Sequence, residues 1–132
     1  MNNSVKNDRI LILDFGSQVT QLIARRIRES GVYCEIYPYM KWEEGINAIQ
    51  PLGIILSGGP ASVIEDSSPQ VAKEVLDYNV PILGICYGQQ TLCSQLGGKV
   101  ENSSKREFGR ANIEIIEDSK FFHGFDKNNL NE

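Results

Sequence analysis

The sequence predicts an α/β fold in which an open, mostly parallel sheet carries helices on both faces. The first observation is a set of four apolar runs, typical of buried strands, at residues 9–14, 32–37, 53–57 and 80–85. The second is the crossover segment, helical or irregular, that separates each run from the next and so gives a repeated βαβ pattern. The third is the pair of glycine-containing turns that follow the last two runs, at the edge where parallel sheets bind ligands.

Length and composition predict one ordinary globular domain over residues 1–132. The chain is long enough to bury a core without disulfides or metals, and it is too short for a second domain. Apolar residues make up 41% of the chain and charged residues 23%, which argues against global disorder. We therefore expect a single folded unit.

Net charge and cysteine content limit which classes of partner and which cellular compartment we expect. A net charge of -4 argues against a nucleic-acid partner, because neutralising phosphates needs a basic face. No apolar run is long enough for a membrane span, and the first eight residues lack the apolar core of a signal peptide. Cys34, Cys86 and Cys93 show no metal-type spacing. These features favour the reducing cytoplasm and no metal site, and they leave the oligomeric state open.

The helix after the first strand is expected to begin at Ser17, whose hydroxyl can cap the first turn, and to end at Gly31. Its predicted buried stripe consists of Val19, Leu22, Ile23 and Ile27. The second crossover is expected at residues 42–49 as a short helical or irregular segment. The third is expected to enter a helix at residues 66–69. The apolar face of that third helix would consist of Val71, Ala72, Val75, Leu76 and Tyr78.

The segment after the fourth strand is compatible with a helix over residues 89–96, which Gly97 and Gly98 end. Cys93 lies on this helix, and we expect it to pack in the core as a small apolar residue. Farther on, residues 99–102 and 112–116 are expected to form the short strands of a hairpin-like excursion.

The chain is organised around Cys86, which ends the fourth apolar run and has Gly84 and Gly88 two residues away on either side. This pattern is typical of a nucleophile elbow, where a strained turn between strand and helix requires small neighbours. The partial positive charge of the following helix N-terminus favours thiolate over thiol. The alternative is a tight turn that carries a buried, inert cysteine.

Gly58 and Gly59 follow the third strand directly, which leaves their backbone N–H groups free to face a ligand. Because the carboxyl ends of parallel strands meet at one edge of a sheet, the topology alone brings this turn and Cys86 to one site.

Several segments of the sequence together resemble a known family, the class I, triad-type glutamine amidotransferases. The resemblance extends from about residue 10 to about residue 116 and rests on residues 13–18, 21–26, 56–63, 84–90, 96–98 and 106–109. The cysteine elbow alone indicates the class. The Asp-Phe-Gly-Ser-Gln start, the Ser-Gly-Gly-Pro turn and the Arg-Glu-Phe-Gly segment narrow it to the N-terminal glutaminase domains of the GMP synthase family.

The resemblance implies a flavodoxin-like sheet and a defined chemistry. Cys86 would attack the side-chain carboxamide of glutamine, form a glutamyl thioester and release ammonia. The oxyanion hole would consist of the backbone N–H groups of Gly59 and Tyr87. Gly58 and the side chain of Gln90 would help to hold glutamine, although Gln90 is otherwise read as a solvated helix residue. An ATP-dependent synthetase part would use the ammonia to aminate XMP, and ATP and Mg²⁺ would bind only there.

The sequence departs from the family at the general base. In the family this base is the histidine of a His-Pro-Glu motif downstream of the elbow, whereas the only histidine here, His123, is followed by Gly-Phe. We therefore expect His123 to be structural or solvated. The domain is expected to be incomplete at its C-terminus and inactive alone.

Three functions remain open at this point. The first is the glutaminase part of a GMP synthase. The second is a non-catalytic amidotransferase-like subunit that pairs with a synthetase. The third is a different cysteine hydrolase on a similar sheet, with His123 as the base.

Overall fold

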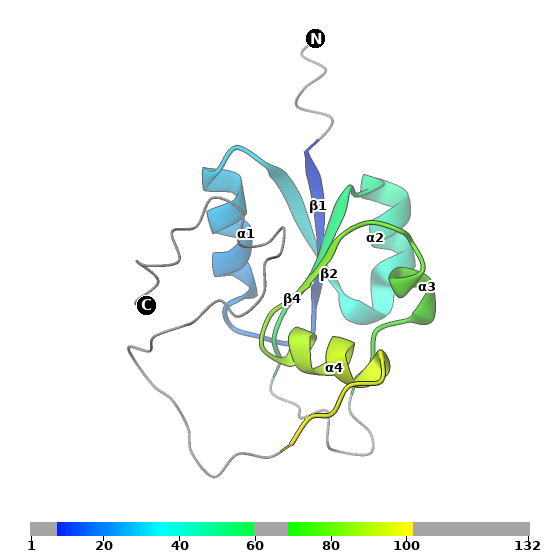
Figure 1. Cartoon of the computed structure of the whole chain (residues 1–132). Helices are drawn as coiled ribbons and strands as arrows, with labels where there is room; N and C mark the ends of the chain where they lie inside the picture. The colour runs from blue at the N-terminus through cyan, green and yellow to red at the C-terminus, as the bar shows by residue number, and fades with distance from the viewer. Residues whose placement is uncertain (1–7, 60–68, 102–132) are drawn as a thin grey trace, which may run out of the picture. The chain divides into compact units, whose positions relative to one another are not determined.

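A computed structural model describes residues 8–59 and 69–101, which form a four-stranded parallel sheet with helices on both faces (Figure 1). The strands are ordered β2-β1-β3-β4 in the sheet. The elements are β1 (Arg9–Asp14), α1 (Thr20–Glu29), β2 (Tyr33–Pro38), a 3-10 turn (Tyr39–Lys41), α2 (Trp42–Ile49), β3 (Gly53–Leu56), α3 (Lys73–Leu76), β4 (Ile82–Gly84) and α4 (Tyr87–Gln95). The predicted α/β fold class is confirmed.

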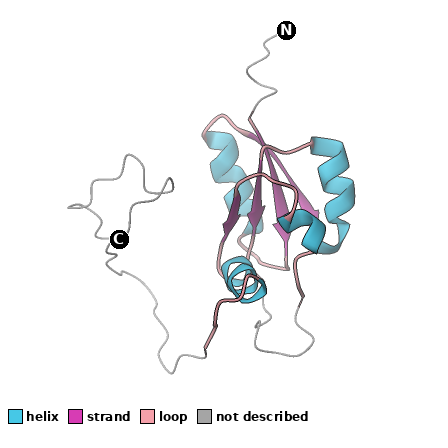
Figure 2. Cartoon of the chain, turned by 45° about the vertical axis from the view of Figure 1, so that its right-hand side comes forward, coloured by secondary structure: helices cyan, strands magenta, loops and turns pink. Residues whose placement is uncertain are grey.

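The alternation of side chains along the central strands divides the core between the two faces of the sheet. Leu11 and Leu13 of β1 pack toward α2 and α3, together with Leu56 of β3. Ile12 of β1 and Ile55 of β3 pack on the opposite face, toward α1. Figure 2 shows the sheet between these two layers of helices. Burial of both faces explains why the strands appear in the sequence as continuous apolar runs.

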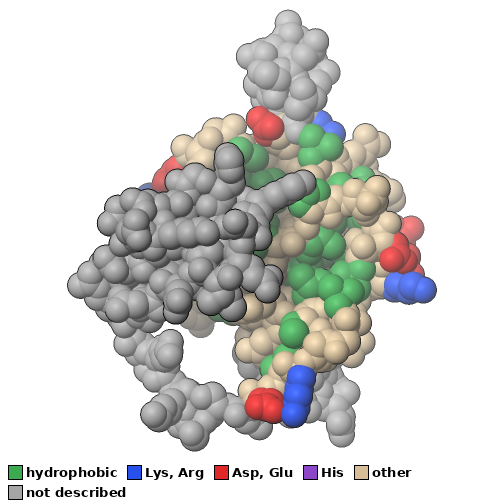
Figure 3. All heavy atoms as spheres, in the orientation of Figure 1, with side chains coloured by type: hydrophobic (Ala, Val, Ile, Leu, Met, Phe, Trp, Pro, Cys, Tyr) green, Lys and Arg blue, Asp and Glu red, His purple; other side chains and the backbone are tan. Residues whose placement is uncertain are grey.

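Burial falls off from the centre of the sheet toward its edge strand β4. Leu83 of β4 is opposite Ile55 of β3 in the register, so the two side chains lie on the same face. Ile55 is 8% exposed, whereas Leu83 is 38% exposed. Figure 3 shows apolar side chains at the surface over the middle of the visible face. The described part of the sheet is therefore best packed around β1 and β3.

Helix α1 begins later than expected, and only Ile23 and Ile27 of its predicted stripe pack against the core. The Ser17 hydroxyl accepts a hydrogen bond from the N–H of Val19, and α1 starts at Thr20 without a side-chain cap. Val19 and Leu22 are 45% and 48% exposed, so they are wrongly assigned to the buried stripe. Thr20 and Ala24 are buried in their place. The small Ala24 side chain allows the helix to approach the sheet closely.

Helix α4 also differs from the expectation. It begins at Tyr87, two residues earlier than predicted, and ends before Gly97, which has a φ of 95° as a helix-ending glycine requires. Cys93 is exposed, so the expectation that it packs in the core is wrong. The described residues 99–101 form no strand. The second expected strand of the excursion, residues 112–116, lies outside the described residues.

A helix that crosses a membrane must be both long and apolar. In the described ranges 8–59 and 69–101, none of the helices combines the length and the apolar character that crossing a bilayer requires.

Cys34 is expected to resist alkylation in the folded chain. Its side chain is 1% exposed, its thiol lies 3.5 Å from the carbonyl oxygen of Ala24, and burial raises the pKa of the thiol above its ordinary value. The fold therefore favours protonated Cys34, and the associated stability is lost as pH rises through the raised pKa. Urea titrations from pH 8 upward should show this loss in the wild-type chain, and Cys34→Ala should reduce it. Equal alkylation of Cys34 and Cys93 by iodoacetamide at pH 8 would contradict the expectation.

Candidate active site

The ends of β3 and β4 bring the glycine turn and the cysteine together. Leu56 of β3 pairs with Gly84 of β4, and the N–H of Ile85 donates a 2.9 Å hydrogen bond to the carbonyl oxygen of Leu56. The two strands are therefore in register up to the point where each turn begins. A methyl group placed on Gly58 would lie 3.2 Å from the Cβ atom of Cys86. Gly58 and Cys86 thus lie in contact, as the sequence predicts.

Cys86 has the strained backbone of a nucleophile elbow. Its φ of 53° and ψ of -117° lie in a region that residues with a side chain rarely adopt. The residue is exposed and occupies the N-cap position of α4. The N–H of Gln90 donates a 3.1 Å hydrogen bond to the carbonyl oxygen of Cys86, which starts the helix at the elbow. The alternative of a buried cysteine is therefore excluded, and the role of Cys86 as the nucleophile stays a prediction.

The glycines beside Cys86 are required by close backbone contacts. A methyl group on Gly84 would lie 2.7 Å from the backbone N and Cα atoms of Gln89. A methyl group on Gly88 would lie 2.1 Å from the carbonyl oxygen of Leu56. The strand, the turn and the helix can approach this closely only with hydrogen at both positions.

Gly59, one of the two residues assigned to the oxyanion hole, is just as tightly placed. A methyl group there would lie 2.2 Å from the carbonyl oxygen of Phe15. Tyr87, the other assigned residue, is the first residue of α4, so its N–H has no acceptor within the helix. Both groups therefore belong to the segments that meet at Cys86, and their assignment stays a prediction.

A polar cluster beneath the glycine turn was missed by the sequence reasoning. Oδ1 of Asp14 accepts hydrogen bonds from the N–H groups of Gly16 and Ser17, at 2.8 and 3.2 Å. The hydroxyl of Thr20 lies 2.9 Å from the same oxygen and 3.0 Å from the hydroxyl of Ser57. Thr20 and Ser57 are 2% and 0% exposed. The cluster thus fixes the start of α1 against the residue that precedes Gly58.

The signal for this cluster was present but ambiguous. An aspartate at the end of a strand, followed by glycine and serine, is typical of a side chain that accepts backbone N–H bonds. The contribution of Ser57 depends on strand order, which places β1 next to β3. Local sequence alone does not contain that information.

Three aromatic rings line the turn that follows β1. The rings of Phe15 and Tyr39 are stacked, with centroids 4.8 Å apart. Phe15 also meets the ring of Tyr87 at 5.4 Å, with the planes tilted by 54°. Tyr87, at the start of α4, is thereby packed against the end of β1. The aromatic contact supports the position of the helix that carries Cys86.

The structure gives less information on the other two residues considered for the site, Gln90 and His123. Gln90 is exposed and lies about one helical turn beyond Cys86, so its role in holding glutamine stays a prediction. His123 lies outside the described residues. Across residues 8–59 and 69–101, no group of three His, Cys, Asp or Glu side chains is arranged to hold a metal ion.

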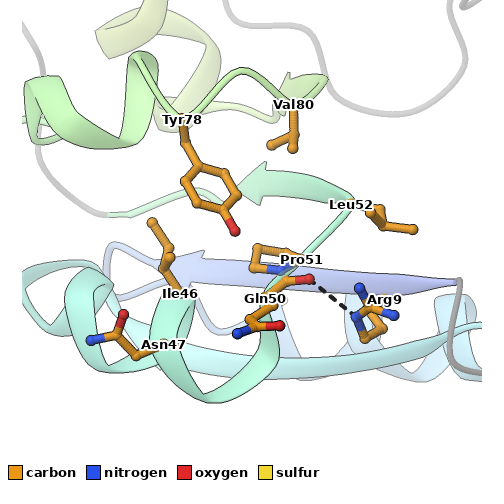
Figure 4. Close-up of a pocket in the computed structure, with 8 residues that line it drawn as sticks. All are labelled: Arg9, Ile46, Asn47, Gln50, Pro51, Leu52, Tyr78 and Val80. Carbon is orange, nitrogen blue, oxygen red and sulfur yellow. Dashed lines mark hydrogen bonds between the residues drawn. The ribbon is translucent and has the colours of Figure 1, made fainter.

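A hollow of about 480 Å³ lies at the opposite, amino edge of the sheet (Figure 4). Nε of Arg9, which begins β1, donates hydrogen bonds to the carbonyl oxygens of Ile49 and Gln50 at the end of α2. A cation at a helix C-terminus is a stabilising arrangement. Arg9 therefore has a structural role, and the hollow is remote from the Cys86 edge.

Comparison with known proteins agrees with this geometry. The family model for class-I glutamine amidotransferases matches residues 11–130. A glutamine-hydrolyzing GMP synthase of Agrobacterium fabrum is 63% identical over 118 residues, which is 89% of this chain and 22% of the relative. The glutamine-hydrolyzing GMP synthase of Allorhizobium ampelinum is 57% identical over 124 residues, 94% of this chain and 24% of that protein. The chain thus spans about a quarter of the length of these curated relatives.

A solved structure supports the fold and the family together. It is described as a GMP synthase subunit from Thermoplasma acidophilum, with a TM-score of 0.74 and 31% sequence identity. The match covers 90% of this chain and 60% of that one. The resemblance inferred from the sequence motifs is confirmed. With the cysteine elbow in contact with the glycine turn, the chain belongs to the class I glutamine amidotransferase family.

Proposed function

We propose that this chain carries the glutamine-hydrolysing step of a GMP synthase. The observation that supports this most directly is Cys86, exposed on a strained turn at the start of α4 and in contact with Gly58. The Cys86 thiolate attacks the carboxamide carbon of glutamine, the C–N bond of the tetrahedral intermediate breaks, and ammonia leaves with a proton from a general acid. Water then attacks the glutamyl thioester, which releases glutamate and the thiol.

The oxyanion of the tetrahedral intermediate is assigned to the backbone N–H groups of Gly59 and Tyr87. The tight packing of Gly59 against Phe15 and the position of Tyr87 at the start of α4 support this assignment, because both keep the backbone fixed near Cys86. Fixed donors are effective because they need no reorganisation as charge develops. Loss of one such donor reduces the rate by roughly 10² to 10³.

Gly58 and Gln90 are assigned to glutamine binding. Gly58 is buried between Ser17 and Cys86, since a methyl group there would lie 3.6 Å from the Cβ atom of Ser17. The absence of a side chain at Gly58 lets the turn after β3 lie directly against Cys86, which places the Gly58 backbone beside the proposed nucleophile. Gln90, exposed on α4, offers an amide that could bond with the glutamine headgroup.

The ammonia is proposed to reach an ATP-dependent synthetase part that converts XMP to GMP in the cytoplasm. The names of the relatives, glutamine-hydrolyzing GMP synthases, support this partner. We assign no cofactor to this domain and place ATP and Mg²⁺ in the synthetase part.

The proposed reaction also requires a general base. The 132 residues contain one histidine, His123, and no His-Pro-Glu motif. We assign the base to a residue other than His123 and expect slow turnover by these residues alone. Added imidazole should then accelerate ammonia release, because a small base can reach an exposed thiol.

The test is ammonia release from glutamine by the 132-residue chain, with and without imidazole, combined with mass spectrometry of acid-quenched protein. A hydroxylamine-sensitive glutamyl adduct on Cys86 and faster turnover with imidazole would support the proposal. The absence of any adduct, with binding to a synthetase partner, would favour the non-catalytic alternative. Fast turnover that His123→Ala abolishes would favour the hydrolase alternative and contradict the assignment of the base.

A further inference from the structure

Three side chains on helix α4 form an inward-facing polar stripe. Tyr87, Thr91 and Gln95 are spaced four residues apart, so they lie above one another on the same side of the helix. Tyr87 and Thr91 are 3% and 0% exposed. The Tyr87 hydroxyl donates a hydrogen bond to the carbonyl oxygen of Pro69. The inner face of α4 is therefore held largely by hydrogen bonds and only partly by apolar packing.

The side-chain amide of Gln95 forms hydrogen bonds with both the N–H and the carbonyl group of Val71, as the backbone of an adjacent β-strand does. Val71 N–H donates to Oε1 of Gln95 at 2.9 Å, and Nε2 of Gln95 donates to the carbonyl oxygen of Val71 at 2.8 Å. The hydroxyl of Thr91 donates to the same Oε1 at 2.8 Å, which fixes the orientation of the amide. Val71 is 5% exposed and packs in the core with Leu56. Both backbone groups of Val71 are thus satisfied by one side chain.

Helix α4 is consequently fixed at both ends. At its start, Gly88 lies against the carbonyl oxygen of Leu56, where a methyl group would be 2.1 Å away. At its last residue, Gln95 binds Val71. The helix has nine residues, which corresponds to a length of about 13 Å. Because the short helix is held at two points, its axis has a fixed orientation. Cys86, which directly precedes the helix, is therefore also held in place.

We propose that Gln95 is a positioning residue for the Cys86 nucleophile, an inference that rests on the proposed function. Without the bonds of Gln95, the far end of α4 is released and the helix can tilt about its contact at Gly88. Such a tilt displaces the Cys86 thiol relative to Gly58. A displacement of 1 Å can reduce a rate by about 10², and a tilt about a nearby pivot moves the thiol less. We therefore expect an effect of about tenfold on reactions of Cys86.

The test replaces Gln95 with methionine, which preserves length and approximate volume but removes both amide hydrogen bonds. The matched control is Gln21→Met, the same substitution at an exposed position of α1. The readout is labelling of Cys86 by the diazoketone analogue of glutamine, followed by peptide mass spectrometry on the 132-residue chain. Gln95→Met should lower the maximal labelling rate about tenfold. The analogue concentration at half-maximal rate should change less than about twofold, because Gln95 is assigned no contact with glutamine.

Two further variants separate positioning from simple support of the fold. Gln95→Glu keeps an acceptor for Val71 N–H and for the Thr91 hydroxyl but replaces the Nε2 donor by an oxygen facing the carbonyl oxygen of Val71, so it should lower the maximal rate at least as much as Gln95→Met although its shape is that of glutamine. Thr91→Val leaves both Gln95–Val71 bonds in place and should give about a threefold loss. This variant decides the question if Gln95→Met does not fold. All labelling is measured well below each thermal midpoint, where loss of stability alone leaves the rate unchanged.

The outcomes distinguish this inference from the function on which it rests. Equal maximal rates in wild type and folded Gln95→Met, or in wild type and Thr91→Val where Gln95→Met does not fold, would overturn the positioning role alone. A wild-type Cys86 that the analogue does not label saturably would overturn the proposed function and this inference with it. A lower maximal rate in Gln95→Met, with Gln21→Met unchanged, would establish the role.

Discussion

Replacing Cys86 with alanine is expected to abolish the glutamyl adduct and to reduce ammonia release with imidazole to the uncatalysed level. The thiol forms the covalent bond in the proposed step, and no other side chain shares its position at the start of α4 among the described residues. Alanine keeps the φ of the elbow as readily as cysteine does, so the fold should be retained. The measurement is adduct formation by mass spectrometry beside ammonia release with imidazole present.

Cys93→Ala is the matched control for this prediction. Cys93 is also exposed and also lies on α4, but it is located in the last turns of the helix, far from the glycine turn. It should retain wild-type adduct formation. An adduct that persists in Cys86→Ala and disappears in Cys93→Ala would show that the nucleophile has been misassigned.

Replacing Gly88 with alanine is expected to lower the free energy of unfolding by about 3 kcal/mol or more. Two effects oppose each other at this helical position. Alanine favours a helix over glycine by about 1 kcal/mol. However, its methyl group would lie 2.1 Å from the carbonyl oxygen of Leu56 and 2.8 Å from the Leu56 Cβ atom. The backbone of a buried strand cannot rotate away as a side chain can, so the steric effect dominates.

Urea unfolding of Gly88→Ala beside Gly53→Ala would test this expectation. Gly53 lies in β3, and a methyl group there would meet its nearest neighbours at 3.8 and 3.9 Å, which is ordinary contact. Gly53→Ala should therefore stay within about 1 kcal/mol of wild type. If both variants unfold at the same urea concentration, the close approach of α4 to β3 is not what stabilises this part of the molecule. In addition, Gly88→Ala should slow labelling of Cys86 by displacing the elbow.

The strands and the strained cysteine could be predicted from the sequence because their signals are local. The apolar run of β1 gives the bounds of that strand, Arg9–Asp14, as the structure has them. The glycine spacing around Cys86 predicts the strained turn, which the structure shows as a φ of 53° at Cys86, and the small neighbours. Each of these features depends on neighbouring residues in the chain, whose chemistry is visible in the sequence.

The apolar residues predicted for the third crossover pack in the core as expected, whereas the faces of α1 and α4 could not be predicted in full, because polar contacts with other segments determine them. Thr20 turns inward because its hydroxyl lies beside Asp14 and Ser57, which leaves Val19 and Leu22 at the surface. Cys93 is two residues from the buried Thr91, a rotation of about 200° around the helix, so it points outward. Hydrophobicity alone assigns these positions incorrectly, because the partners that decide them come from other strands and segments.

Because β3 and β4 pair in a fixed register, substitutions should affect the site differently from insertions or deletions. The pairing of Leu56 with Gly84 sets the level of Gly58 against that of Cys86. A substitution near either turn can shift these groups by fractions of an ångström and so change the rate by degrees. By contrast, insertion or deletion of one residue in either strand moves one turn by about 3.3 Å and turns its side chains to the other face. Length variation in β3 or β4 should therefore be all-or-none for function, whereas the loops that lead into these strands at the amino edge, residues 50–52 and 77–81, can gain or lose residues with little effect on Cys86.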